Sequence, residues 1–265
     1  MRGGAQAHLL EADDGHWYVV KFRNNPQHPR ILVNELLCAA FLDYLKIAAP
    51  PAALVRVTAE FLAANPDVHV SLGARRVPFE PGWHFGSRYP GDPGRIAVYD
   101  FLPDPLLPAV ANLQDFRAVL VLDKWVANAD GRQSVFYRAL VRRGGTASTP
   151  SARPGFVAQM IDHGYAFDGP NWDFPDSPLQ GLYARRLVYD GVGSLADFEP
   201  WLEQVVNFPD EVIDRAWKAI PLEWLNGDDE ALSRLLERLF ERRKRVPDLI
   251  ASCRGARTSP FANWK

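Results

Sequence analysis

Two residues of opposite charge, Lys21 and Glu35, stand in stretches of sequence that are otherwise almost entirely apolar. Glu35 lies in the run 31–42, and on a helix its neighbours at positions 31, 32, 38, 39 and 42 would all be apolar. A carboxylate enclosed by apolar groups is costly unless a cation meets it, and Lys21 lies among two valines and a phenylalanine. The pattern predicts a buried Lys21–Glu35 ion pair. In the alternative, Glu35 points outward from a helix edge and Lys21 ends a strand in water.

A second group of polar residues is expected at the open end of a hairpin. Residues 134–141 and 156–161 are strand-like, and the second segment runs directly into Asp162. An antiparallel hairpin places positions 133 and 162 at the same end, so Asp130, Gln133 and Asp162 should come close together. Carboxylate and amide oxygens suit Mg²⁺ that carries a nucleotide phosphate. The alternative is that both aspartates are ordinary turn residues.

Near the amino terminus, the sequence Gly3-Gly4-Ala5-Gln6 precedes the first expected strand. Backbone N–H groups in such a segment can face a phosphate. A pair of glycines close to a terminus is more often just a flexible chain end.

The first half of the chain supplies the elements that would position Lys21 and Glu35. Strands are predicted over 6–11 and 17–22, joined by a turn, and a helix over 31–46 follows them. A further strand is predicted over 96–102, and the prolines at 103, 105 and 108 mark the main internal boundary.

Beyond that boundary the pattern becomes helical, with a helix predicted over 112–127, then the hairpin, then mostly helix to the end. The order predicts an α+β fold with segregated elements rather than a doubly wound sheet. Residues 1–102 would form a β-rich region with one helix, and residues 103–265 a mainly helical region with a central hairpin.

Composition excludes several classes of protein. The chain has 265 residues, of which 47% are hydrophobic, so it can bury a sizeable core. The formal net charge of −2 gives no overall positive field for nucleic acid or an anionic membrane. The two cysteines, Cys38 and Cys253, show no zinc-site spacing and suggest no disulfide framework. No run approaches the length of a membrane span and no signal peptide is apparent, so the cytoplasm is the expected compartment.

With these residues in order, the chain resembles the bacterial HipA-like kinase domain family, a distant relative of protein kinases, over essentially its whole length. The resemblance implies a two-lobed fold that uses ATP and Mg²⁺ to phosphorylate a protein serine or threonine or a small-molecule hydroxyl. Gly3, Gly4 and Gln6 resemble the glycine-rich phosphate loop, and Val19-Val20-Lys21-Phe22 is similar to the strand that carries the phosphate-binding lysine. Glu35 is similar to the helix partner of that lysine.

Further matches follow in the order of the kinase layout. The segment 98–103, which contains Tyr99, Asp100 and Phe101, looks like the hinge whose backbone binds adenine. Asn128-Ala129-Asp130 resembles the catalytic loop, with Asp130 as the base. Ile161-Asp162-His163-Gly164 resembles the Asp-Phe-Gly element, with Asp162 as metal ligand and Gln133 as the nearby amide.

The sequence departs from the family pattern in the catalytic loop. The family usually places an asparagine about five residues after the aspartate as a second metal ligand, and position 135 is a valine. A nucleotide-binding pseudokinase that acts as an interaction module is therefore the alternative function. The sequence begins at the glycine loop, so we expect either that the true start lies upstream or that this region lacks the strand that precedes the loop in the family. The sequence identifies neither the acceptor substrate nor a protein partner.

Overall fold

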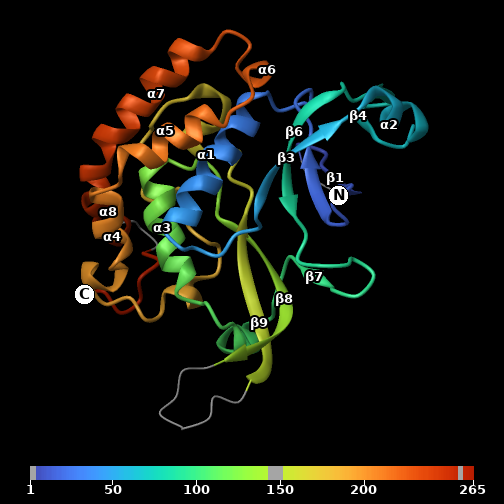
Figure 1. Cartoon of the computed structure of the whole chain (residues 1–265). Helices are drawn as coiled ribbons and strands as arrows, with labels where there is room; N and C mark the ends of the chain where they lie inside the picture. The colour runs from blue at the N-terminus through green and yellow to red at the C-terminus, as the bar shows by residue number, and fades with distance from the viewer. Residues whose placement is uncertain (1–3, 143–151, 256–258) are drawn as a thin grey trace.

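The computed structural model describes residues 4–142, 152–255 and 259–265, and Gly3 therefore lies outside the described residues. The chain forms a mixed α/β structure with antiparallel sheets and several helices (Figure 1). This mixture and order of elements is compatible with the kinase-like fold that the resemblance implies.

The first sheet contains four antiparallel strands in the order β1-β2-β6-β3. Its members are β1 (His8–Glu11), β2 (Trp17–Lys21), β3 (Ala52–Val57) and β6 (Gly82–Arg88). Strand β6 lies between β2 and β3, which places Val19 opposite Ser87 in the register. The end of β6 therefore lies beside the strand that carries Lys21.

A small ribbon of β4 (His69–Leu72) and β5 (Arg75–Pro78) packs beside this sheet together with helix α2 (Ala59–Ala64) (Figure 1). Their apolar side chains form a separate cluster, which consists of Tyr18, Val20, Phe22, Val57, Val70 and Phe79. Alternation along β2 explains this arrangement, because Tyr18 and Val20 point into the cluster while Val19 and Lys21 point to the opposite face.

Helix α1 (Arg30–Tyr44) runs between the sheet and the later helices (Figure 1). It packs against β6 on one side and against α5 (Asp210–Lys218), α6 (Leu222–Leu225) and α3 (Asp115–Trp125) on the other. The helix is apolar almost all round, and nine of its residues are buried, which is typical of a helix in the centre of a molecule.

The second half of the chain holds the long hairpin of β8 (Gln133–Arg142) and β9 (Ala152–Ile161), with the two-residue strand β7 (Val98–Tyr99) on its edge. Gln133 pairs with Ile161 in the register, so Asp162 follows directly at the open end, as predicted. Helices α4 (Trp201–Val206), α7 (Asp229–Arg242) and α8 (Val246–Arg254) complete the helical region around a large apolar core.

The predicted strand over 96–102 is much shorter in the structure. Only Val98 and Tyr99 pair with β8, opposite Tyr137 and Phe136, and Phe101 is 59% exposed. The apolar composition of the segment predicts a strand, but the segment lies at the edge of the hairpin and the chain leaves it before Pro103. The predicted helices over 31–46 and 112–127 correspond to α1 and α3.

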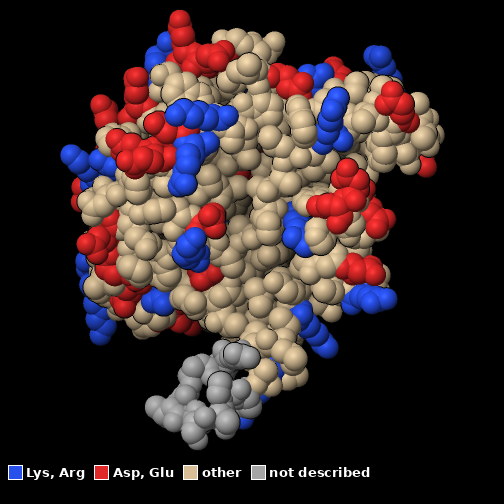
Figure 2. Space-filling model, viewed as in Figure 1, with Lys and Arg blue, Asp and Glu red and all other residues tan. Residues whose placement is uncertain are grey.

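On the face shown in Figure 2, the Lys and Arg side chains of the described residues stand among Asp and Glu side chains. None of the helices within the described ranges combines the length and apolarity that a membrane crossing requires.

Candidate active site

The side chain of Lys21 is held by two carboxylates from distant parts of the chain. Its ammonium pairs with Glu35 on α1 and donates a hydrogen bond of 2.9 Å to Oδ1 of Asp162. Glu35 is 3% exposed, so the burial pattern predicted for the run 31–42 is correct. The Lys21–Glu35 pair is present, and Asp162 joins it.

Electrostatics keep this group charged. Burial alone would lower the pKa of the Lys21 ammonium, but the carboxylates of Glu35 and Asp162 raise that pKa above its ordinary value. Burial would likewise raise the pKa of Asp162, but the Lys21 charge lowers it. Two carboxylates thus surround one ammonium, and the excess negative charge favours a further cation at this point.

The residue before Glu35 fixes the segment that follows Asp162. Asn34 is fully buried, and its Nδ2 lies 2.7 Å from the carbonyl oxygen of Gly164, 2.9 Å from that of Ala166 and 3.0 Å from that of Gly169. Its Oδ1 accepts a hydrogen bond of 2.8 Å from the indole of Trp172. Helix α1 therefore positions both the partner of Lys21 and the chain that leaves Asp162.

At the hairpin end, Gln133 joins the two predicted aspartates. Its Nε2 donates to Oδ2 of Asp130 at 3.3 Å, and a hydrogen bond from Gln133 also contributes to the low pKa of Asp162. Asp130 itself is exposed, and its backbone carbonyl accepts a hydrogen bond from the N–H of Gly181. Asp130, Gln133 and Asp162 thus lie together, as the hairpin geometry predicts.

A buried ion pair beneath this loop is absent from the sequence-based interpretation. Arg132 forms a two-pronged contact with Asp123 on α3, at 2.8 and 2.6 Å, and donates to the carbonyl oxygen of Ile161 at 2.6 Å. Asn128 donates to the same carboxylate and accepts the backbone N–H of Asp130. An aspartate within the apolar run of α3 was the available signal, by the same reasoning that identified Glu35.

A cavity of about 240 Å³ opens above these groups. Lys21, Glu35, Gln133 and Asp162 lie on its polar side. Apolar side chains from both halves of the chain also line it, namely Ala5, Ala7, Val19, Pro50, Val98, Val135 and Ile161. A wall of apolar side chains with a few converging polar and charged groups is typical of a small-molecule site.

The structure brings some of the residues predicted to bind a cofactor to this cavity and not others. Gly4 and Gln6 line it, and the Gln6 side chain exchanges two hydrogen bonds with the backbone of Ser71 on β4. Tyr99, Asp100 and Phe101 are exposed and lie outside the lining. The segment 87–90 at the end of β6 takes their place, because the sheet order sets β6 beside β2.

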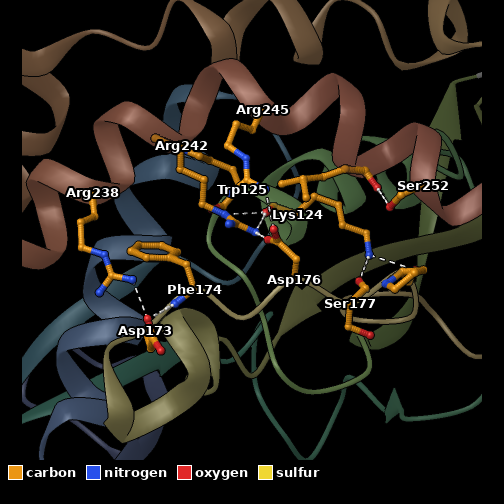
Figure 3. A network of polar contacts seen from close by, with 12 residues as sticks. Lys124, Trp125, Asp173, Phe174, Asp176, Ser177, Arg238, Arg242, Arg245 and Ser252 are labelled. Atoms are coloured by element: carbon orange, nitrogen blue, oxygen red, sulfur yellow. Dashed lines mark hydrogen bonds and ion pairs between the residues drawn. The ribbon is translucent and has the colours of Figure 1, made fainter.

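The segment 173–178, which follows Asp162 along the chain, pairs with arginines of α7 and of the turn Arg243–Arg245 that follows it (Figure 3). Arg238 pairs with Asp173 at 2.5 Å, and Arg242 and Arg245 pair with Asp176 at 2.7 and 2.5 Å. These contacts fix a loop that leads towards Gly181 and the Asp130 backbone.

Lysine and aromatic contacts reinforce this attachment. The ammonium of Lys124, a buried residue of α3, donates to the carbonyl oxygens of Ser177 and Pro178 at 2.9 and 3.0 Å (Figure 3). The guanidinium groups of Arg238 and Arg242 lie over the Phe174 ring, 5.1 and 5.3 Å from its centre. The loop is thus held from two elements of the helical region.

Comparison with known proteins identifies a family for the chain. The search of curated proteins finds no match to the chain. The family model described as HipA-like kinase matches residues 1–246, which include every side chain of the candidate site. The chain therefore belongs to the HipA-like kinase family.

Proposed function

We propose that this protein is an ATP- and Mg²⁺-dependent phosphotransferase that phosphorylates a hydroxyl group of a protein serine or threonine or of a small molecule. The observation that carries the proposal is the placement of Lys21 between Glu35 and Asp162 at the polar end of a cavity with apolar walls. Membership of the HipA-like kinase family supports it.

In this proposal the chain has the two lobes of a kinase, residues 1–102 for the nucleotide and residues 103–265 for catalysis. The separate apolar cluster of the first sheet, distinct from the large core, supports this division. Two buried free cysteines, Cys38 and Cys253, are consistent with the reducing cytoplasm as the expected compartment.

The residues take the following roles. Lys21, fixed by Glu35, would orient the α- and β-phosphates, and the N–H groups around Gly4 would face the phosphate chain. Asp130 would accept a hydrogen bond from the acceptor hydroxyl and take its proton late, since positioning dominates this reaction. The Gln133 amide donates a hydrogen bond to Oδ2 of the Asp130 carboxylate and so restricts its orientation.

Among the described residues no group of three or more His, Cys, Asp or Glu side chains could hold a metal by itself, so the proposed magnesium ion would be held together with the nucleotide phosphates. Only Oδ1 of Asp162 contacts Lys21, which leaves its second oxygen for a metal, and Gln133 adds an amide beside it. Mg²⁺ bound there with the nucleotide would supply positive charge to the phosphate oxygens. Asp162 and Gln133 would hold that ion.

One observation favours a second candidate, a pseudokinase that binds nucleotide and acts as an interaction module. Val135, which lines the cavity, stands where the family usually has an asparagine that binds a second metal ion. With that ligand missing, the retained Lys21–Glu35–Asp162 group could bind a nucleotide without efficient transfer.

Incubation with γ-labelled ATP, Mg²⁺ or Mn²⁺ and a cell lysate separates the two candidates. We expect label in a protein or a small molecule, and its loss when Asp130→Asn replaces the wild type. Nucleotide binding without any transfer would support the pseudokinase. Neither binding nor transfer would overturn both candidates.

A further inference from the structure

The hairpin that carries Asp162 also supplies a polar side chain deeper in the cavity. Gln133 pairs with Ile161 in the register, and Val135 pairs with Gln159. All four residues line the cavity, so its wall follows the hairpin away from Asp162. At about 3.4 Å per residue, Gln159 begins roughly 10 Å along the strand from Asp162. That offset is comparable with the distance from the inner phosphates of an extended nucleotide to its base.

The walls around this deeper part suit a flat ring. Val19 from β2, Val98 from β7 and Val135 from β8 line the cavity, together with Ala7 and Pro50. Aliphatic side chains from two halves of the molecule can enclose the two faces of a base. They provide no hydrogen bonds to its edge, so recognition of the edge must come from other groups.

The backbone of residues 88–90, which lines the cavity, has few N–H groups free to donate a hydrogen bond to a ligand. The N–H of Arg88 donates to the carbonyl oxygen of Pro51 at 2.9 Å, and the N–H of Tyr89 donates to that of Trp17 at 2.7 Å. Pro90, the next residue of the wall, has no N–H. At these three positions the backbone can offer a base carbonyl oxygens but no hydrogen-bond donor.

Four glutamines line the cavity, and Gln159 differs from the other three. Gln6 bonds to Ser71, Gln27 donates to the hydroxyl of Tyr165, and Gln133 donates to Asp130. Oε1 of Gln159 is shielded from solvent and has no hydrogen-bond partner among the described residues. A buried acceptor without a partner is unfavourable, so a ligand that satisfies the amide is stabilised.

We propose that Gln159 recognises the edge of an adenine base, and this inference rests on the proposed nucleotide-binding function. A glutamine amide presents a donor and an acceptor side by side, which match a ring nitrogen and the 6-amino group of adenine. The 6-amino group donates to Oε1, and Nε2 donates to the ring nitrogen. Gln159 is thus a specificity-determining residue for the nucleotide.

The test compares ATP with purine riboside triphosphate, which lacks only the 6-amino group. Dissociation constants with Mg²⁺ are measured by calorimetry for the wild type and for Gln159→Met, which keeps side-chain length without the amide. We expect the wild type to prefer ATP by about 10-fold, the equivalent of one hydrogen bond, and the variant to lose most of that preference. Gln27→Met, another glutamine of the wall, is the matched control and should keep the wild-type preference.

The outcomes separate this inference from the function on which it rests. A wild-type protein that binds neither nucleotide overturns the proposed function and the role of Gln159 together. Tight binding with the same ratio of constants in the wild type and in Gln159→Met overturns the role of Gln159 alone. Urea unfolding of both variants confirms that each is folded before the ratios are compared.

Discussion

The ammonium of Lys21 contacts the carboxylate of Asp162 at 2.9 Å, although 141 positions of sequence separate the two residues. The contact links the first sheet to the chain that leaves β9. Glu35 closes the group from α1, so three elements meet at one charge. A change in any of the three residues should therefore affect both the stability of the fold and the geometry of the site.

Removal of one member of the Lys21–Glu35 pair should be more harmful than removal of both. Lys21→Met leaves two carboxylates around an apolar side chain and should lower the free energy of unfolding by about 3–5 kcal/mol. The double variant Lys21→Met with Glu35→Leu should cost distinctly less, because no buried carboxylate remains on α1. Urea unfolding of both single variants and the double variant measures the coupling. Additive losses would show that the two side chains act independently.

The sequence predicts this part of the site because buried charge is costly. Glu35 and Lys21 each stand in an apolar segment, and an ion pair between them removes the cost of burying either charge alone. The same argument applied to Asp123, which lies in an apolar run of α3, indicates that this carboxylate needs a buried cation. It does not identify Arg132 as the partner, because the sequence around Arg132 is typical of an exposed turn.

The wall of the cavity could not be predicted in this way. Tyr99, Asp100 and Phe101 follow a strand-like segment, yet the segment 87–90 lines the cavity instead. That difference depends on β6 inserting between β2 and β3, a long-range pairing that local patterns do not encode. The hairpin end was predictable because a single local pairing, β8 with β9, brings Gln133 and Asp162 together.

Stability should fall below neutral pH because of His84. Burial and then the nearby Arg23 charge lower the pKa of His84 to about 4, and its Nδ1 accepts the backbone N–H of Arg23. The unfolded chain protonates this histidine below pH 6.5 while the folded chain does not, so stability is lost as the pH falls from about 6.5 to about 4. The loss at the lower limit is about 3 kcal/mol.

The variant His84→Asn tests that assignment, because Asn keeps an acceptor for the Arg23 N–H and cannot be protonated. Between pH 7 and pH 4.5, the free energy of unfolding measured in urea should fall less in the variant than in the wild type. A decline remains in the variant, since burial also holds the pKa of His163 well below its usual value. The exposed His16 provides the control, and an equal slope in His84→Asn and His16→Gln would exclude His84 as a source.

Two arginines that pair with the same carboxylate should contribute differently to the free energy of unfolding. Arg242 is 5% exposed, while the Arg245 side chain is 59% exposed, and both contact Asp176 (Figure 3). Arg242 also donates to the carbonyl oxygens of Lys124 and Trp125. Arg242→Ala should therefore lower the free energy of unfolding by about 3 kcal/mol, and Arg245→Ala by less than about 1 kcal/mol.

Hydrogen exchange locates the effect of these two substitutions. We expect faster exchange of amides in the segment 173–182 in Arg242→Ala, with little change in Arg245→Ala, because the buried guanidinium holds that segment. Exchange in Arg242→Ala no faster than in Arg245→Ala would mean that the Arg238–Asp173 pair and Lys124 hold the segment without Arg242.

The two aspartates of the hairpin end should separate binding from chemistry. Asp162→Asn removes one negative charge beside Lys21 and the proposed metal, so Mg²⁺-dependent nucleotide affinity should fall by about 10-fold or more. Asp130 is exposed and contacts Gln133 rather than Lys21. Because Asp130 would act on the acceptor in the transition state, Asp130→Asn should leave nucleotide affinity near that of the wild type and reduce phosphoryl transfer by about 100-fold or more.

Calorimetry with Mg·ATP and single-turnover transfer of label measure the two effects separately. A pseudokinase would show the first effect with no transfer to lose, whereas unchanged affinity in both variants would leave these aspartates as ordinary residues of a turn.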